Sequence, residues 1–441
     1  MLKAFANIGR IPELRRKFLF TLGLLAICRV GVYIPLPGVD TVKVAEFMRQ
    51  AEGGALGKLM VLADIFSGGA IAKGAILALG IMPYISASII FQVLMPVVPA
   101  LERIAREGES GRKRIAQYTR YATVLLCIVQ ALMMTKMLNQ PKVNLIVGEY
   151  WKFAVTATIA MTAGTLFLMW MGEQIDEFGL GNGVSLIIMM NILSRMPSAI
   201  RRLAGSVTMN LGGEPDKPIG PERLVLLVGL FVFMIVAVVL VTQAQRRVPM
   251  NHARRTREGF SHRSYLPLRV NMSGVIAIIF AQSVMMLPNF LKNLSYVGSF
   301  FEYFVPWRFF YVMLYMGLII FFSYFYTAIT FNPVEKANEF KQYGAFIPGI
   351  RPGRRTAAYL ERIMNRITLA GAAFVAIIAV APQIMSSNLK VDAIVASFFG
   401  GTSLLITVGV ALDLVQRIES YMMMQAYEGF MKGGRIRGRR G

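Results

Sequence analysis

Charged residues are scarce in this chain of 441 residues, of which Asp, Glu, Lys and Arg together form 16%. An ordinary soluble domain has roughly 25%. Hydrophobic residues form 55% of the chain, and its mean hydropathy is +0.55. Windows of about 20 predominantly apolar residues recur along the whole length, and each can span a hydrocarbon core of ~30 Å. This composition excludes a soluble globular protein and indicates a polytopic membrane protein.

The chain has only two cysteines, Cys28 and Cys127, and two histidines, His252 and His262. Each cysteine lies inside an apolar run, and no CxxC pair or Cys/His cluster occurs. A disulfide framework or a structural zinc site therefore has little support. The two histidines share a basic loop, which is expected to be solvated. We expect no metal site and no cofactor.

Motifs of known enzyme classes are also missing: GxSxG, HExxH, Walker A and DxD arrangements do not occur. The run GLGNG at 179–183 resembles a phosphate loop only superficially, because no Lys follows it and three acidic residues precede it. Acids inside the apolar spans, which mark ion-coupled transporters, are scarce, and Asp413 and Glu419 fall at the end of the last span. The sequence predicts a protein that is not an enzyme.

Basic residues exceed acidic ones, 47 to 24, which gives a net charge of +23. In a soluble chain this balance would suggest nucleic acid, but here the basic residues lie in loops between apolar spans. We predict ten spans, with cores at 18–34, 75–98, 121–138, 153–171, 183–200, 222–243, 270–290, 309–331, 367–385 and 393–414. With both termini in the cytoplasm the inner loops hold most of the basic residues, which satisfies the positive-inside rule. No cleavage site follows the first apolar run, so this span is expected to stay in the mature protein.

Ten spans divide into two sets of five, which predicts an all-α fold of two halves with opposite orientation, as in inverted-repeat membrane proteins. The predicted parts are an N-terminal half, an external hinge loop, a C-terminal half and a basic cytoplasmic tail, at 1–200, 201–221, 222–414 and 415–441. The inner loops 244–269 and 332–366 exceed the usual few-residue connection, which favours docking of a large cytoplasmic partner. The tail is expected either to fix topology and contact anionic lipid or to bind a partner.

The stretch 66–92, FSGGAIAKGAILALGIMPYISASIIFQ, differs from an ordinary span. Ser67 is expected to cap a weak helix over Ser67–Gly74, because glycine costs roughly 1 kcal/mol against alanine in a helix. Polar residues and Pro83 then interrupt the following apolar run. Irregular backbone at membrane depth survives only inside protein or along a cavity. The stretch therefore predicts an interior, such as a pore.

Two further features of the sequence leave alternatives open. Arg29, in the outer third of the first span, would either extend to the lipid headgroups or pair inside the protein. The 28 methionines either fill gaps between packed helices or form an adaptable surface for apolar guests.

Seven runs together resemble the SecY family of bacterial protein-conducting channels. They occur in the order of that family and reach from the first part of the chain to the last span. The runs are 66–92, EGESGRKRIAQYTRY (107–121), FLMWMGEQI (167–175), GNGVSLII (181–188), FYTAITFNP (325–333), GAFIPGIRPG (344–353) and FGGTSLLI (399–406).

The resemblance implies ten transmembrane helices in two pseudo-symmetric five-helix halves, hinged between spans five and six, with an hourglass pore inside one monomer. It implies a pore ring formed by Ile81, Ile85, Ile188, Ile279 and Ile406. It implies a plug at about 64–74, formed by Asp64, Ile65, Phe66, Ser67, Gly68, Gly69, Ala70, Ile71, Ala72, Lys73 and Gly74. It also implies a lateral gate between spans two and three on one side and seven and eight on the other, with polar residues Ser86, Gln130, Gln282 and Ser283.

The family likeness implies transport of unfolded secretory proteins across the bacterial cytoplasmic membrane and sideways release of apolar segments into lipid. The implied partners are SecE-like and SecG-like membrane subunits, the SecA motor ATPase, the ribosome, signal peptides and nascent chains, besides anionic lipids. Two basic loops would contact the ribosome or the motor through Arg254, Arg255, Arg257, Arg263, Arg351, Arg354 and Arg355. Against ribosomal RNA these would act mostly on phosphates. The simpler alternative is that these arginines only fix topology.

Two positions depart from the family pattern. Ala277 replaces a usual proline, and the loss of this helix breaker is expected to straighten the gate helix. The loop 251–266 is shorter than usual, so the partner contacts of individual residues in the family's loop are not assigned to residues of this loop.

The alternative function is a secondary transporter of a small solute, which would need a polar site at the midplane. A membrane scaffold without a pore is a further alternative, but it would not need a plug.

Overall fold

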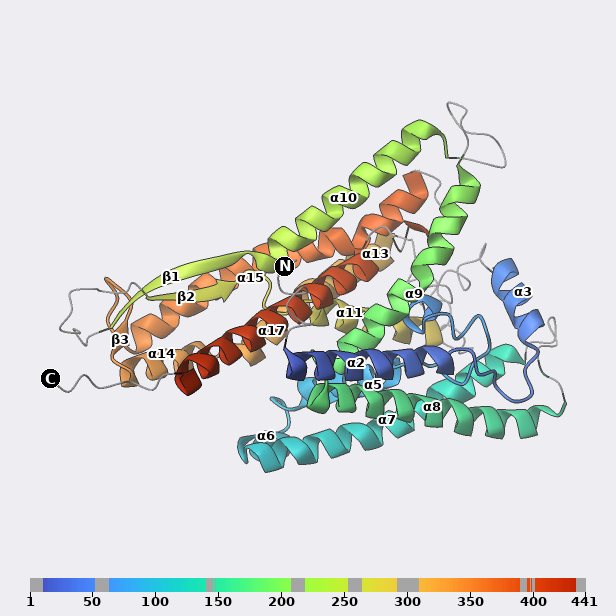
Figure 1. Ribbon diagram of the computed structural model, residues 1–441, viewed down its shortest axis with the longest axis horizontal. Coiled ribbons are helices and arrows are strands. Elements are labelled where there is room, and N and C mark those ends of the chain that lie inside the picture. Colours follow the sequence, from blue (N-terminus) through green and yellow to red (C-terminus); the bar gives the residue numbers. More distant parts are fainter. Residues whose placement is uncertain are drawn as a thin grey trace.

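The computed structural model describes residues 11–51, 63–139, 146, 148–207, 219–252, 264–291, 309–388, 395–396, 398 and 401–433. Within these ranges the chain is predominantly helical, which confirms the predicted fold class, and long helices run side by side along the longest axis (Figure 1). The middle of the predicted hinge loop, 208–218, and the end of the predicted tail, 434–441, lie outside the described residues.

Proline and asparagine mark several helix starts in the first part of the chain. Pro12 and Pro83 lie in first turns, where the missing backbone N–H is not needed. Asn182 caps the last helix of this part, because its Oδ1 accepts a hydrogen bond from the Ser185 N–H at 2.9 Å. The helices are α2 (Pro12–Gly31), α3 (Thr41–Ala51), α5 (Met82–Leu94), α6 (Pro99–Arg106), α7 (Glu109–Leu138), α8 (Tyr150–Phe178) and α9 (Gly183–Ser206).

The second part of the chain adds a small sheet that the sequence did not predict. Its antiparallel order is β2-β1-β3, with Val248 opposite Leu266 and Asn251 opposite Phe346. Helix α17 runs on past the last predicted span, through much of the predicted tail. The elements are α10 (Pro221–Gln243), β1 (Gln245–His252), β2 (Ser264–Arg269), α11 (Ile276–Leu291), α13 (Phe309–Thr330), α14 (Pro333–Gln342), β3 (Ala345–Phe346), α15 (Arg354–Asn388) and α17 (Gly401–Gly433).

Each of the ten predicted spans overlaps one of the helices α2, α5, α7, α8, α9, α10, α11, α13, α15 and α17. Among the described residues, 7 helices are by themselves long and apolar enough to cross a membrane. The pair α5 and α6, bent by 97°, would make an eighth, and the apolar part of α11, Ile276–Met285, is shorter. Helix α2 has the length of a span but carries Glu13 and several basic residues in its first turns.

Helix packing repeats itself between the two parts of the chain. Helix α2 contacts α8 and α9, and in the same way α10 contacts α15 and α17. The series α5–α7–α8–α9 packs in order, as does the series α11–α13–α15–α17. The two series meet where α5 packs against α11 and α9 packs against α17. This pattern is the one expected of two related five-helix halves that face each other.

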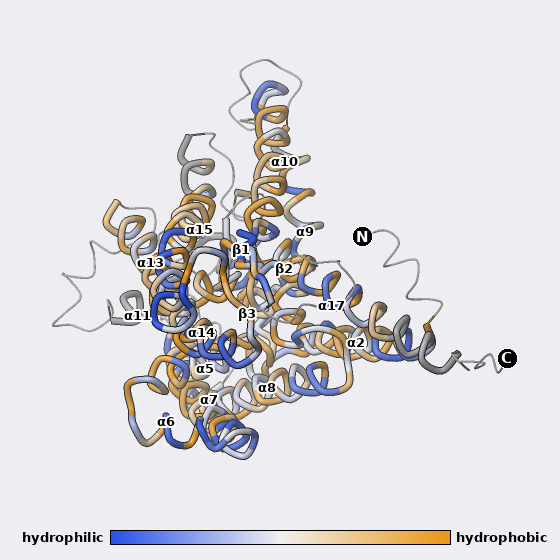
Figure 2. The backbone as a smooth tube through the Cα atoms, turned by 90° about the vertical axis from the view of Figure 1, so that its left-hand side faces the viewer, coloured by the Kyte–Doolittle hydropathy of each residue, from blue (hydrophilic) through white to orange (hydrophobic). Residues whose placement is uncertain are grey.

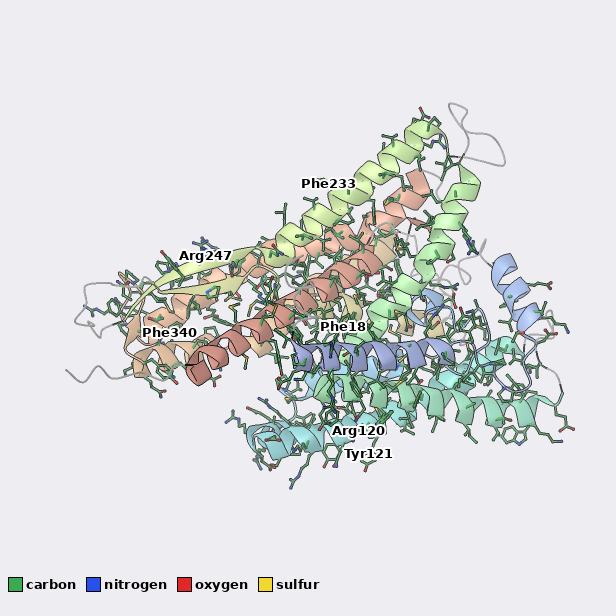
Figure 3. The ribbon with its side chains drawn as sticks, viewed as in Figure 1. Phe18, Arg120, Tyr121, Phe233, Arg247 and Phe340 are labelled. Atoms are coloured by element: carbon green, nitrogen blue, oxygen red, sulfur yellow. The ribbon has the colours of Figure 1, made fainter. Side chains whose placement is uncertain are left out.

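The outer surface of the helices is apolar. Phe233 on α10 and Tyr121 on α7 are 66% and 71% exposed, and both point away from the bundle (Figure 3). Hydrophilic segments gather at α14, toward the end that carries the sheet, whereas α10 and α13 are largely hydrophobic (Figure 2). An exposed apolar surface of this extent is typical of contact with lipid or with other membrane subunits.

The end of the molecule that carries β1, β2, β3, α14 and α6 is called the basic end below, because exposed arginines gather there. Arg246 and Arg247 are exposed on β1, and Arg103 and Arg106 on α6. Figure 3 places Arg247 at this end, and Figure 1 places α3 at the opposite end.

Candidate functional site

The segment 64–74, the predicted plug, is helical only over 64–66 and consists of turns from Ser67 onward. A short helical stretch ends at Phe66, and turns continue from Ser67 to Ile81. The expected helix over Ser67–Gly74 is therefore wrong. Gly68 and Gly69 take φ values of 68° and 92°, a left-handed conformation that glycine adopts without strain and that ends a helix.

The plug closes on itself through Asp64, which is only 2% exposed. The Asp64 carbonyl accepts a hydrogen bond from the Gly69 N–H at 2.8 Å. One side-chain oxygen, Oδ1, accepts a second from the Ala72 N–H at 2.8 Å. A single acidic residue thus joins the beginning of the plug to its end.

Three polar side chains from α2 and α9 hold the plug in place. Asn191 Nδ2 donates to the Phe66 carbonyl at 2.8 Å, and Arg29 Nη1 donates to the Gly68 carbonyl at 2.7 Å. Arg195 forms an ion pair with the second carboxylate oxygen of Asp64. Buried backbone carbonyls need such donors, since an unpaired one is costly in a dry interior. Arg29 therefore pairs inside the protein, which decides between the two alternatives left open for it.

The fit around the two plug glycines is tight. A Cβ atom on Gly68 would lie 2.8 Å from Asn191 Oδ1, and one on Gly69 would lie 3.1 Å from the Cζ atom of Arg195. The loop after α2 adds backbone contacts, since the Leu36 N–H donates to the Gly74 carbonyl at 2.8 Å. A side chain at Gly68 would clash with Asn191, and one at Gly69 would require the guanidinium group of Arg195 to shift.

The isoleucines predicted to form the pore ring come from both halves and share one hydrophobic cluster. They lie at the start of α5 and on α9, α11 and α17. Ile81, Ile85, Ile188 and Ile406 are buried, whereas Ile279 is partly buried. The plug residues Ile65, Phe66 and Ala70 belong to the same cluster. The structure thus brings the predicted ring and the predicted plug into one apolar core.

Three of the residues predicted for the lateral gate lie on α5 and α11, which join the halves, and the fourth lies on α7, which packs against α5. Ser86 on α5, Gln130 on α7 and Gln282 and Ser283 on α11 are all half-buried. Ser283 Oγ donates to the Ile279 carbonyl at 2.9 Å, and the buried Oε1 of Gln282 has no hydrogen-bond donor among the described residues. A buried polar atom without a partner carries a desolvation cost, and it lowers the stability of the packing around α11.

The predicted effect of Ala277 has no basis in the fold. Helix α11 begins at Ile276, so Ala277 lies in its first turn, three residues after the left-handed Gly274. A proline in a first turn removes no helical hydrogen bond. Alanine in its place therefore leaves the path of α11 unchanged.

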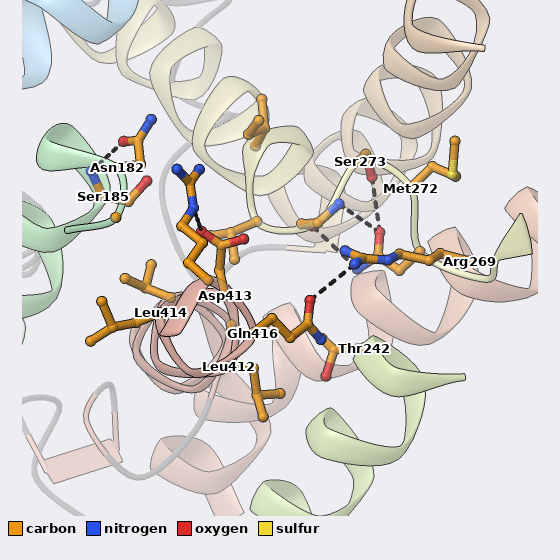
Figure 4. A pocket seen from close by; sticks show the side chains of 18 of the residues that line it. Asn182, Ser185, Thr242, Arg269, Met272, Ser273, Leu412, Asp413, Leu414 and Gln416 are labelled. Carbon is orange, nitrogen blue, oxygen red and sulfur yellow. Dashed lines mark hydrogen bonds and ion pairs between the residues drawn. The ribbon is translucent and has the colours of Figure 1, made fainter. Parts of the chain in front are cut away.

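A pocket of about 400 Å³, lined by both polar and apolar residues, opens between the halves at the start of α9, the start of α11 and the middle of α17 (Figure 4). In it Arg269 Nη2 donates to Gln416 Oε1 at 2.9 Å, and Arg417 pairs with Asp413 at 2.9 Å. Its apolar side belongs to the cluster that contains the predicted ring isoleucines, because Leu186 and Val410 line the pocket and are members of that cluster.

The basic residues predicted to contact a partner are only partly described. Arg351, Arg354 and Arg355 are exposed at the junction of the loop after β3 with α15. The other four predicted arginines, Arg254, Arg255, Arg257 and Arg263, lie outside the described residues.

The sequence analysis missed Asn191 and Arg195 as site residues. They lie four residues apart, on one face of a helix whose other face is apolar. Two polar residues at this spacing inside an apolar span were the signal that could have identified them.

Comparisons with known proteins agree with this geometry. The model of the SecY family matches residues 75–415. The chain is 42% identical to the protein translocase subunit SecY of Chlamydia trachomatis, over 98% of this chain and 99% of that one. It is 40% identical to the subunit of the same name from Thermotoga maritima, over 100% of both chains, and to that of Escherichia coli K12, over 98% and 96%.

Solved structures share the fold. One described as "The structure of a protein conducting channel" matches with a TM-score of 0.64 at 16% identity, over 93% of each chain. Another, described as Sec61 in the canine ribosome-channel complex from the endoplasmic reticulum, matches with a TM-score of 0.61 at 15% identity, again over 93% of each chain.

The tight fit of the plug glycines predicts that Gly68→Ala loosens the plug. In a chain carrying Ala70→Cys, a buried position, we expect this change to speed labelling by a maleimide reagent on the order of tenfold, or about 1.4 kcal/mol, because the new Cβ would lie 2.8 Å from Asn191 Oδ1. Gly108→Ala is the control, since Gly108 has a similar φ of 80° but open space around it. The chain without Ala70→Cys, treated with the same reagent, corrects for labelling of Cys28 and Cys127. Equal labelling rates for both variants would contradict the described fit.

Proposed function

We propose, because this chain belongs to the SecY family, that it forms a protein-conducting channel that passes unfolded secretory proteins across the bacterial cytoplasmic membrane. The observation that carries this proposal is the arrangement at the centre of the fold. An apolar cluster built by both halves includes part of an irregular segment, and a few polar side chains of α2 and α9 bind the polar groups of that segment. This arrangement suits a segment that blocks the pore at rest and can be displaced, and it does not suit a permanent part of the helix bundle.

The ring isoleucines Ile81, Ile85, Ile188, Ile279 and Ile406 would supply the constriction. Isoleucine is β-branched and stiff at χ1, so a ring of such side chains keeps a defined shape. An apolar constriction excludes ions because water leaves it. The plug would close the constriction at rest and leave it when a chain enters.

The seam between α5 and α11 would be the lateral gate. These helices belong to different halves, and they contact each other directly. A signal sequence has an apolar core of about 7–15 residues, which could enter this seam and partition toward lipid. The half-buried polar residues Ser86, Gln130, Gln282 and Ser283 would make the closed seam less stable than a wholly apolar one.

The basic end would face the cytoplasm, in agreement with the positive-inside rule. Its exposed arginines, with Arg351, Arg354 and Arg355, would contact the ribosome, a SecA-like motor ATPase and anionic lipids. The chain would not hydrolyse anything itself, so energy would come from the motor or from translation. SecE-like and SecG-like subunits would cover part of the exposed apolar surface of the helices.

A secondary transporter is less well supported. Such a protein needs a polar or charged binding site at its midplane. Among the described residues Asp64 is the one buried acid, and Arg195 and the Ala72 N–H already occupy both of its oxygens.

Translocation by the reconstituted chain tests the proposed function. Proteoliposomes would contain this chain with a SecE-like subunit, and the motor ATPase, ATP and a precursor would be added outside. We expect protease protection of the precursor that requires both ATP and the signal peptide. No protection, together with saturable uptake of a small solute, would overturn the proposal in favour of a transporter.

Replacing a ring isoleucine tests the seal. We expect Ile85→Ser and Ile406→Ser each to raise the resting ion conductance in planar bilayers severalfold, because a hydroxyl keeps water in the constriction. Ile90→Ser is the control, since Ile90 lies on the same helix as Ile85 but is 44% exposed. A conductance as low as that of the unchanged chain in both ring variants would refute the ring assignment.

A further inference from the structure

We infer that Arg195 and Asn191 are positioning residues of the plug, and that the ion pair between Arg195 and Asp64 is a latch that keeps the channel closed until water enters it. The inference rests on the proposed function of the chain as a channel and goes beyond it, since it assigns roles to two residues of α9.

The latch joins two segments that are far apart in the chain. Asp64 lies at the start of the plug with its side chain 3% exposed, and Arg195 lies on α9 with its side chain 26% exposed. The carboxylate has one oxygen on Arg195 and the other on the Ala72 N–H. One contact with α9 therefore orders both ends of the plug.

Helix α9 presents the ring and the latch on one face. Ile188 is a predicted ring residue, and Asn191 and Arg195 follow it at spacings of three and four residues, so all three project from the same side of the helix. The face is apolar at Ile188, neutral and polar at Asn191, and charged at Arg195. A plug seated on α9 is thus held beside the constriction that it closes.

Helix α2 completes the holding site. Arg29 donates to the Gly68 carbonyl and lies over the ring of Tyr33, with its Cζ atom 5.3 Å from the ring centroid. Lys73 Nζ, at the end of the plug, lies 3.2 Å from the centroid of the same ring. Arg29 on α2 and Lys73 of the plug therefore both make cation–π contacts with the ring of Tyr33.

The strength of the latch depends on water. Opposite charges attract strongly in a buried site of low dielectric constant, and their attraction falls severalfold when water surrounds them. Removing one partner of a buried ion pair strongly destabilises the closed state, because an unpaired charge remains in the dry interior. The latch is therefore strong while the channel is dry and weak once a chain has brought water into it.

These contacts also allow the gate to open while the plug stays in place. The described polar contacts of the plug, with Arg29, Asn191 and Arg195, all belong to the first half, whereas the gate lies between the halves at α5 and α11. The halves can move apart at the gate without pulling on the latch. An apolar segment could thus enter the gate while the plug still seals the pore.

Conductance of latch variants tests the inference. We expect Asp64→Asn and Arg195→Gln each to raise the resting conductance about tenfold, which corresponds to ~1.4 kcal/mol. The double variant should leak no more than either single variant, because both singles break the same interaction. Arg195→Lys, which keeps the charge, should restore most of the seal. The control is Glu149→Gln with Lys152→Gln, an exposed ion pair outside the plug, which should change nothing.

Each variant is also assayed for ATP-dependent protection of a precursor with an intact signal peptide and of one with a weakened signal peptide. We expect the latch variants to protect the intact precursor normally and the weakened one better than the unchanged chain does. Unchanged conductance in both singles, or additive leaks in the double variant, would overturn the latch. If Ile85→Ser leaks while the latch variants do not, only the latch fails. If the unchanged chain protects no precursor, the proposed function fails.

Discussion

Backbone N–H and C=O groups in a dry interior need hydrogen-bond partners. In the plug, side chains supply these partners in place of a regular helix or sheet. Helices satisfy their own carbonyls, but the turns around Gly68 cannot. Asn191 and Arg29 supply the missing donors, and Arg195 neutralises the acid that ties the plug together. A segment held by a few side chains can leave as a unit. A helix packed on all sides could not leave at comparable cost.

The arrangement of the two halves determines where the plug lies. Helices α9 and α17 meet on one side and α5 and α11 on the other, so the interior between them is lined by both halves. The apolar cluster there contains the ring isoleucines and the apolar plug residues together. The pocket beside Arg269 and Asp413 borders this cluster, because Leu186 and Val410 belong to both.

The sequence predicted what depends on composition and order, and it missed what depends on contacts between distant residues. Hydropathy placed a described helix at each of the ten predicted spans, and 7 of the described helices are by themselves long and apolar enough to cross a membrane. The helix expected at Ser67 was wrong because the left-handed turns at Gly68 and Gly69 are set by α9. The sheet was missed because its strands lie in the two long inner loops, and pairing between β1 and β3 joins residues about 95 positions apart. The latch was missed because nothing near Asp64 in the sequence indicates Arg195.

The most direct test of this account is to locate a translocating chain inside the protein. A precursor would be arrested midway, and photo-crosslinkers would be placed at Ile85 and Ile188 in the core and at Val225 and Phe233 on the exposed face of α10. The account predicts crosslinks from the two core positions to the arrested chain and none from α10. Crosslinks from α10 alone would show that the chain passes outside this fold, and the central claim would be contradicted.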